Sequence, residues 1–316
     1  MKINAHLHVN YQGLTHDTII TYLDKHHFDL CWLLTWEEIN PGKWYYSHLS
    51  VEDVLHVYET YPSRVIPMYA PDPNNMDAPI LLKNAYDKGI KGCAELKVTL
   101  NWQSDAIKKL LSVVSELNIP VLFHMEESYH WTHPLEQDNA FDNFFLKILK
   151  WKGLSGLPNQ FINRMIDNWT PLYRWVQKRT AFFPGYLLDF SALGIILDLY
   201  PTINFIGHGP LFWKHISKHD EPSSAYPKGH ISEKGLLCYF LDHYPNLYAD
   251  ISAYSGFNAL QRDIHFSKQF VHDYSHKLIF GTDNTHYGHE NLLKSLKLSS
   301  EILNQIFWEN AYKLLK

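Results

Sequence analysis

The sequence has few cysteines, no long apolar run and no excess of basic residues. Cys31, Cys93 and Cys238 are odd in number and far apart, which argues against a disulfide framework and fits a reducing compartment. Because the chain has no Cys-x-x-Cys pair, a zinc site built from thiolates is not expected.

The chain also lacks membrane, export and nucleic-acid signals. No segment approaches the ~18 consecutive apolar residues of a membrane span. The N-terminal stretch MKINAHLHVNYQG has two histidines where a signal peptide needs its apolar core. A formal net charge of -5 does not suggest the basic surface that binds nucleic acid. We therefore expect a soluble, cytoplasmic protein whose partner is a small-molecule substrate rather than a nucleic acid or a membrane.

Enough apolar sequence is present for a sizeable core, since 46% of the 316 residues are hydrophobic. Eight short apolar runs recur along the chain. They are continuous rather than alternating, as expected for parallel strands buried on both faces. The runs are 2–9, 28–36, 64–73, 90–98, 119–127, 203–210, 246–253 and 277–284.

Helical patterns separate these runs, for example at residues 50–62 and 104–118, and a further one ends the chain at 299–316. Ser50, followed three positions later by Asp53, is a capping-box-like start. Strands that alternate with helices imply right-handed βαβ units, and eight such units predict a (β/α)8 TIM barrel. A doubly wound open sheet is the second choice, but no Gly-x-Gly-x-x-Gly follows the first run.

Residues 128–190 break this rhythm, because they show no strand pattern and are rich in Trp, Phe and Tyr. Segments this long inside a compact domain are usually functional or form their own helices. Since the segment follows the fifth strand, we predict a single domain over 1–316 with a helical, aromatic-rich insertion over the C-terminal face of the barrel. Packing of the insertion on itself or against a second subunit, in a homodimer, is the alternative.

Possible metal ligands end several of the predicted strands. His6 and His8 end the first run, although about one His-x-His is expected by chance with 20 histidines in 316 residues. Two residues apart on a strand, they face the same side. His124, His208 and Asp283 end three later runs, and inward residues at the C-terminal ends of barrel strands converge on one pocket. Such a nitrogen and oxygen donor set suits a divalent transition metal, with Zn²⁺ as the first choice.

This pattern resembles the amidohydrolase superfamily, in which His-x-His follows strand 1, His follows strands 5 and 6, and Asp follows strand 8. The segments YPTINFIGHGP, YPNLYADISA, LIFGTDN and EILNQIFWENAYKLL are similar to the amidohydrolase-2 branch. Within it, GHGPLFWKHIS, YPKG and YADISAYSGFNALQRD resemble a subgroup related to metal-dependent hydrolases and to aminocarboxymuconate-semialdehyde decarboxylase-like proteins.

The resemblance implies one metal ion held by His6, His8, His124 and Asp283, with His208 close to the reacting water. The metal would lower the pKa of that water and polarise a carbonyl group. Asp283 would take the proton from the water and deliver it to the leaving group.

The fourth strand leaves two alternatives open. Glu95 and Lys97 are two apart and share a face. Some branches of the superfamily place a glutamate or a carboxylated lysine there to bind a second metal, so two ions are possible although one is favoured. Otherwise the two residues form a buried ion pair, or Lys97 binds a substrate carboxylate.

Other polar and aromatic residues are weaker candidates. Those considered for substrate binding are Glu126, Trp36, Tyr69, Arg262, Lys228 and His286. Each has a structural alternative, as a rim, core, loop or surface residue. Asp250, at the end of the seventh run, could orient a ligand histidine.

The function expected from these residues is metal-dependent hydrolysis of an ester, lactone or amide. The alternative is a metal-dependent non-oxidative decarboxylase of an aromatic or related acid, since the same branch contains such lyases. A non-catalytic metal- or ligand-binding barrel is a third possibility. The full ligand set argues against it, since catalytic metal sites keep an open position and structural ones are saturated.

Overall fold

The computed structural model describes residues 1–38, 48–132, 180–218 and 224–315. The chain divides into two units. The larger comprises Met1–Glu127 and Gly185–Lys316, and the smaller comprises Ser128–Pro184.

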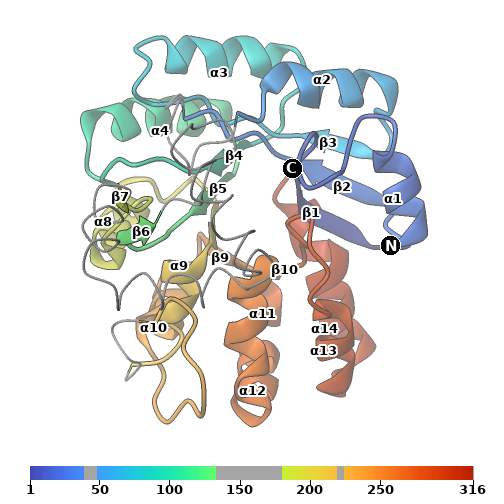
Figure 1. Ribbon diagram of the computed structural model, residues 1–316, viewed down its shortest axis with the longest axis vertical. Coiled ribbons are helices and arrows are strands. Elements are labelled where there is room, and N and C mark those ends of the chain that lie inside the picture. The colour runs from blue at the N-terminus through green and yellow to red at the C-terminus, as the bar shows by residue number, and fades with distance from the viewer. Residues whose placement is uncertain (39–47, 133–179, 219–223, 316) are drawn as a thin grey trace, which may run out of the picture. The chain divides into compact units, whose positions relative to one another are not determined.

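Eight parallel strands form the centre of the larger unit (Figure 1). One sheet has the order β1-β2-β3 and the other has the order β10-β9-β8-β5-β4. Backbone hydrogen bonds join the two sheets, from Lys91 N to Pro67 O (2.9 Å) and from Ala5 N to Phe280 O (2.9 Å). The strands therefore close into a barrel, and each of the eight predicted runs contains one of them. Their bounds are β1 (Ile3–Leu7), β2 (Leu30–Leu33), β3 (Val65–Pro67), β4 (Cys93–Leu96), β5 (Val121–His124), β8 (Phe205–His208), β9 (Leu247–Asp250) and β10 (Leu278–Ile279).

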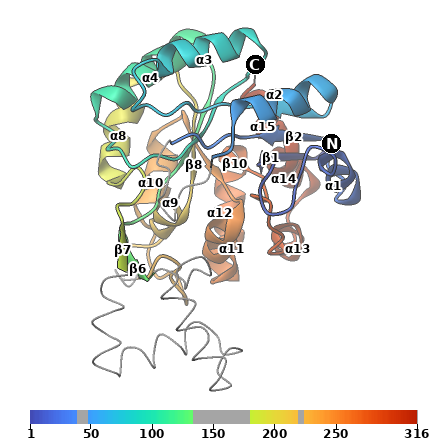
Figure 2. The same ribbon diagram turned by 45° about the horizontal axis from the view of Figure 1, so that its top comes forward.

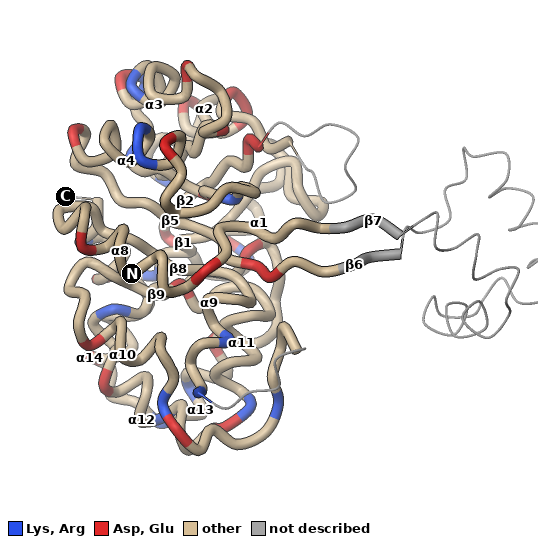
Figure 3. Tube along the Cα trace, turned by 90° about the vertical axis from the view of Figure 1, so that its left-hand side faces the viewer, with Lys and Arg blue, Asp and Glu red and all other residues tan. Residues whose placement is uncertain are grey.

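Helices lie around the outside of these strands (Figures 1 and 2). Ser50 caps α2 by accepting a hydrogen bond from Asp53 N (3.2 Å), as the capping pattern predicts. Acidic and basic residues are interspersed over the outer helices (Figure 3). Among the described residues, no helix has the length and apolar character needed to cross a membrane. The helices are α1 (Ile19–Lys25), α2 (Val51–Thr60), α3 (Ala78–Asp87), α4 (Asp105–Leu117), α8 (Phe190–Leu199), α9 (Pro210–Lys214), α10 (Leu236–His243), α11 (Ala253–Gln261), α12 (Ile264–Tyr274), η1 (Ser275–Lys277), α13 (His289–Ser295), α14 (Ser300–Asn304), η2 (Gln305–Glu309) and α15 (Asn310–Lys313).

The smaller unit begins and ends with strands. β6 (Tyr129–Thr132) and β7 (Thr180–Phe183) form an antiparallel pair, where the sequence suggested no strand. The two segments are too far apart in sequence for periodicity to reveal their pairing. The expected insertion is also shorter at its end, because the chain rejoins the barrel unit at Gly185 and α8 starts at Phe190. The helices predicted within 133–179 lie outside the described residues, and the position of the insertion over the barrel stays a prediction.

The barrel interior is filled by a cluster to which every strand or its end contributes. Its members are Ile3, Ala5, Trp32, Leu34, Met68, Ala94, Leu122, Ile206, Tyr248 and Ile279, with Ala311 and Leu314 from the C-terminal segment. His124, His208 and Asp250 each lie two residues beyond a member of this cluster, on the same face of their strands. The apolar interior thus forms a floor, and the next inward positions form a polar layer above it.

An irregularity in β1 turns its histidines toward that layer. Ala5 packs in the interior cluster, whereas Leu7, two residues later, packs in the outer core. A regular strand would place both on one face, but the register of β1 against β2 shifts between Asn4 and Leu7. Without this shift, His6 and His8 would face away from the barrel centre.

Candidate metal centre

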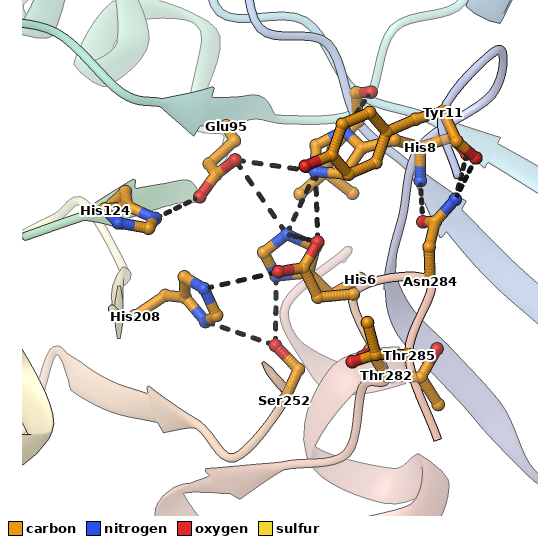
Figure 4. A network of polar contacts seen from close by, with 12 residues as sticks. His6, His8, Tyr11, Glu95, His124, His208, Ser252, Thr282, Asn284 and Thr285 are labelled. Carbon is orange, nitrogen blue, oxygen red and sulfur yellow. Dashed lines mark hydrogen bonds and ion pairs between the residues drawn. The ribbon is translucent and has the colours of Figure 1, made fainter. Parts of the chain in front are cut away.

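Side chains from six strands or strand ends gather at the carboxyl end of the barrel (Figure 4). His124 and His208 are direct partners in the β5–β8 register, and their ring centroids are 5.1 Å apart. The other members of the group are His6 from β1, His8 directly after it, Glu95 from β4, Asp250 from β9 and Asp283, which follows β10. Apart from Asp283, whose side chain is a quarter exposed, these residues are buried.

His6, His8 and Asp283 form a compact donor group. The two Nε2 atoms are 3.2 Å apart, and each is 3.6 Å from Asp283 Oδ1. A second group combines His6 with Glu95 and His208, so His6 belongs to both. The donor atoms of each group all lie within 4.8 Å of one another. Imidazole nitrogens and carboxylate oxygens at this spacing fit a divalent ion, so the residues present match the metal that the sequence suggested.

Hydrogen bonds fix the orientation of three of the imidazole rings. His8 Nδ1 donates to Leu34 O (2.9 Å), because a carbonyl oxygen can only accept. Asp250 Oδ2 lies 2.7 Å from His6 Nδ1 and 2.9 Å from His208 Nδ1. All three Nδ1 atoms are thus engaged away from the centre. The Nε2 atoms remain for a metal ion or a proton.

His124 is held differently. Its Nδ1 lies 2.8 Å from Glu95 Oε1 and its Nε2 lies 3.1 Å from Glu126 Oε2. The other oxygen of Glu95 is 3.5 Å from His8 Nε2. Glu95 therefore connects His124 to the donor group, and Glu126 contacts the ring of His124. Substrate binding by Glu126 stays a prediction. The role of His124 as a direct metal ligand stays a prediction.

The buried carboxylates determine the electrostatics of the centre. Burial opposes the charge on His6, but Asp283, Asp250 and Glu95 together raise its pKa to about 9. Burial also opposes the charge on Glu95, yet Lys97 and His124 hold its pKa well below the usual range. Desolvation and the neighbouring His6 lower the pKa of His208. A site with this much ionised carboxylate attracts a cation, and binding of a divalent ion would release the His6 proton.

Lys97 and two aromatic residues adjoin this group. Lys97 Nζ lies 4.1 Å from the ring centroid of Trp36 and 5.5 Å from that of Tyr186. Among the described residues Lys97 forms no ion pair, so the expected buried Glu95–Lys97 pair is not observed. Trp36 is buried and contacts Tyr186 edge to face at 6.0 Å, and its predicted contact with a substrate stays a prediction.

Other predicted substrate contacts lie elsewhere. Tyr69 packs in the outer core, beside the carboxyl group of Glu37. His286 stacks on His26, with ring centroids 4.0 Å apart, and lines a cavity of about 310 Å³ with Lys2 and Phe28. His286 lies only three residues after Asp283, but the backbone turns after β10, so closeness in sequence did not place His286 with the donor group. Arg262 follows the end of α11, and Lys228 is exposed.

Sequence reasoning missed four residues of the site. Ser252 Oγ donates to Asp250 Oδ2 (2.6 Å). Asn284 accepts from His8 N and donates to His8 O, both at 2.8 Å, which ties the segment after β10 to β1. The ring of Tyr11 lies 5.8 Å from that of His8, and Tyr186 lies 5.7 Å from His124. Asn284 directly follows Asp283, and Ser252 lies two residues after Asp250; closeness to an acid at a strand end is the sequence signal that could have identified both residues.

Gly281 leaves no space for a side chain beside the metal centre. A Cβ atom there would lie 2.8 Å from His6 Cβ and 3.1 Å from Asp250 Oδ1. We expect Gly281→Ala to displace this pair and to weaken zinc binding roughly tenfold, as changes to the partners of metal ligands do. Competition with a chromogenic chelator measures the affinity. Gly194→Ala, within α8, is the control for general destabilisation, and an unchanged zinc affinity in Gly281→Ala would contradict the prediction.

Comparisons with known proteins agree with this geometry. Residues 212–316 match the model of a protein family described as amidohydrolase. No curated protein sequence matches the chain significantly. A protein from Acinetobacter baumannii, described as a probable 2-pyrone-4,6-dicarboxylic acid hydrolase, shares the fold with a TM-score of 0.53 at 16% identity, over 99% of this chain and 98% of that one.

Two further solved structures share the fold. A dihydroxybenzoic acid decarboxylase from a Polaromonas species, with bound manganese, has a TM-score of 0.51 at 14% identity, over 99% of this chain and 96% of that one. A TIM-barrel protein from Bordetella bronchiseptica has a TM-score of 0.52 at 12% identity, over 95% of this chain and 82% of that one. The predicted α/β barrel is confirmed by these shared folds, and residues 212–316 are similar to the amidohydrolase family.

Proposed function

We propose that the protein is a metal-dependent hydrolase that acts on an ester, lactone or amide carbonyl of a small molecule. One observation carries this proposal: Asp283 lies 3.6 Å from the Nε2 atoms of both His6 and His8, and its other oxygen lies 3.9 Å from His208 Nε2. A carboxylate placed between a metal donor pair and a further imidazole can both bind a cation and carry a proton.

The proposed cofactor is one divalent ion, with Zn²⁺ as the first choice. His6, His8 and Asp283 would hold it, and Glu95 or His124 would complete the set. The second donor group, His6 with Glu95 and His208, is the place for a second ion if one binds. When bound, a divalent ion lowers the pKa of water and polarises a carbonyl oxygen.

The chain's own residues would manage the protons. Asp283, partly exposed, accepts a proton from the attacking water and passes it to the leaving group. His208, held through Nδ1 by Asp250, presents Nε2 to the reacting atoms and orients them. Burial lowers the pKa of His208, which keeps it neutral and able to donate or accept one hydrogen bond.

Decarboxylation of an aromatic or related acid is the second candidate. Its support is that the manganese-containing decarboxylase shares this fold. In that reaction the same donor group would hold the ion to which the substrate carboxylate binds, and an acid would protonate the carbon that loses carbon dioxide. A small-molecule substrate is proposed in either case, and a homodimer remains a proposal that light scattering can test.

A metal-replacement assay tests the function. The protein is stripped with a chelator, reloaded with Zn²⁺ or Mn²⁺, and given aryl esters, lactones, anilides and aromatic acids. We expect hydrolysis of at least one ester, lactone or amide that returns with metal and is lost in His6→Asn. His276→Asn, at a histidine outside the site, is the matched control. Carbon dioxide release without hydrolysis would establish the second candidate, and metal binding without any turnover would indicate a binding protein.

A further inference from the structure

Lys97 lies beside the candidate centre, and its ammonium group faces aromatic rings. Lys97 lies directly after the end of β4, two residues beyond Glu95 and on the same inward face. Its side chain is only partly exposed. Burial opposes its charge, but the charges of Glu95, Glu126 and Asp283 raise the pKa of Lys97. None of these carboxylates comes within the 4.0 Å of an ion pair.

Aromatic rings hold the ammonium group in place of a carboxylate. Trp36 and Tyr186 lie 4.1 and 5.5 Å from Nζ, and they contact each other edge to face. Such rings attract a cation without occupying its N–H groups. Among the described residues Lys97 makes no hydrogen bond, so its three N–H donors are left for a ligand.

Aromatic contacts also connect this group to the donor residues. Tyr186 touches Trp36 on one side and His124 on the other, at ring centroid distances of 6.0 and 5.7 Å. Tyr11 stands against His8 at 5.8 Å (Figure 4). A ligand that reaches both the metal donors and Lys97 would therefore lie along aromatic side chains, which favours a flat molecule.

We propose that Lys97 is the specificity-determining residue of the site and binds a carboxylate on a flat, unsaturated or aromatic substrate. This carboxylate is separate from the carbonyl group that reacts. The inference rests on the proposed function, because that function supplies the reacting carbonyl group. A charged oxygen is favoured over a neutral one, because a charge-assisted hydrogen bond is about twice as strong as a neutral one and compensates a partly buried ammonium group.

Binding of two matched probes to the zinc-loaded protein tests the proposal without turnover. Benzoate and benzamide have the same flat body and differ in charge. By isothermal titration calorimetry, we expect Lys97→Met to weaken the binding of benzoate at least tenfold and to change the binding of benzamide less than twofold. Lys91→Met, which removes an exposed lysine just before β4, should change neither. Zinc content and thermal melting establish that each variant is loaded and folded.

Several results would overturn the proposal. Unchanged benzoate affinity in Lys97→Met would mean that benzoate binds through the metal alone. An equal loss of affinity for benzoate and benzamide would mean that Lys97 only packs against the ligand. If Lys97→Met does not fold, Lys97→Arg replaces it. That variant keeps the charge, and it should still bind benzoate at least ten times more tightly than benzamide; equal affinities would refute the assignment.

Activity separates this proposal from the proposed function. The parent protein should hydrolyse an ester that bears a carboxylate in preference to the analogue in which that carboxylate is an amide. In Lys97→Met this preference should be lost, because the KM for the carboxylate-bearing ester rises. If no carbonyl substrate is hydrolysed but benzoate binding depends on Lys97, the reaction is wrong and the carboxylate site stands. If hydrolysis occurs with no preference and no Lys97 dependence, the reaction stands and the carboxylate site is wrong.

Discussion

Replacing Asp283 by asparagine is expected to lower kcat/KM by about 10³-fold or more. The amide cannot accept the proton that the carboxylate takes from water, and loss of a positioned acid or base alone costs 10²–10⁴-fold. It also removes a charged donor that lies 3.6 Å from both His6 and His8 Nε2. Steady-state kinetics on the best ester or lactone, with zinc content measured on the same samples, check this prediction.

The control for Asp283→Asn is Asp87→Asn, an exposed residue that ends α3. It removes the same charge at an exposed position outside the donor group and should leave kcat/KM unchanged. If Asp283→Asn kept zinc and retained turnover within a few fold of the parent protein, Asp283 would not be the proton carrier.

The second large effect is expected from Asp250→Asn, with zinc affinity about 10–100-fold weaker. One carboxylate oxygen, Asp250 Oδ2, accepts from His6 Nδ1 and His208 Nδ1 and from Ser252 Oγ. The oxygen of an amide is uncharged, so it accepts weaker hydrogen bonds from the two imidazole Nδ1–H groups than the carboxylate oxygen does. Because the change affects His6 as a donor and His208 as an orienting group, kcat should fall together with metal affinity.

Ser252→Ala provides the comparison for Asp250→Asn. It removes one of the three donors to Oδ2 but leaves the carboxylate and both imidazoles in place. We expect zinc affinity in Ser252→Ala to change several-fold less than in Asp250→Asn. Equal effects would show that the hydroxyl, rather than the charge of Asp250, determines the ring orientations.

The strands were predictable because each is a continuous apolar run that ends in a polar residue, and this pattern reflects burial between the interior and the helices. His6, His8, His124, His208 and Asp283 could be grouped because parallel strands bring their carboxyl ends to one edge. The same rule indicated that Glu95 and Lys97 share a face, but it could not distinguish an ion pair from separate partners. That difference depends on side-chain directions set by Trp36 and Tyr186.

Residues in loops were less predictable. Tyr69 and His286 follow strand ends, yet one packs in the outer core and the other stacks on His26. Tyr186 joins the site from a segment more than fifty positions after β5, and no local pattern marks it. The β6–β7 pair was missed for the same reason, since its two halves belong to distant parts of the chain. Long-range pairing leaves no periodic trace in sequence.

Closure of the barrel between β1 and β10 has a consequence for how the centre is assembled. Asn4 Nδ2 donates to Thr282 Oγ1 across 278 residues, and His6 meets Asp250 across 244. Contacts this distant in sequence form late, because the chain entropy of a long loop opposes them until the intervening elements have folded. A ribosome-bound chain that lacks β10 has His6 and His8 but neither Asp283 nor the strand that carries it into place. We therefore expect the donor group of His6, His8 and Asp283 to be complete only after the final strand docks.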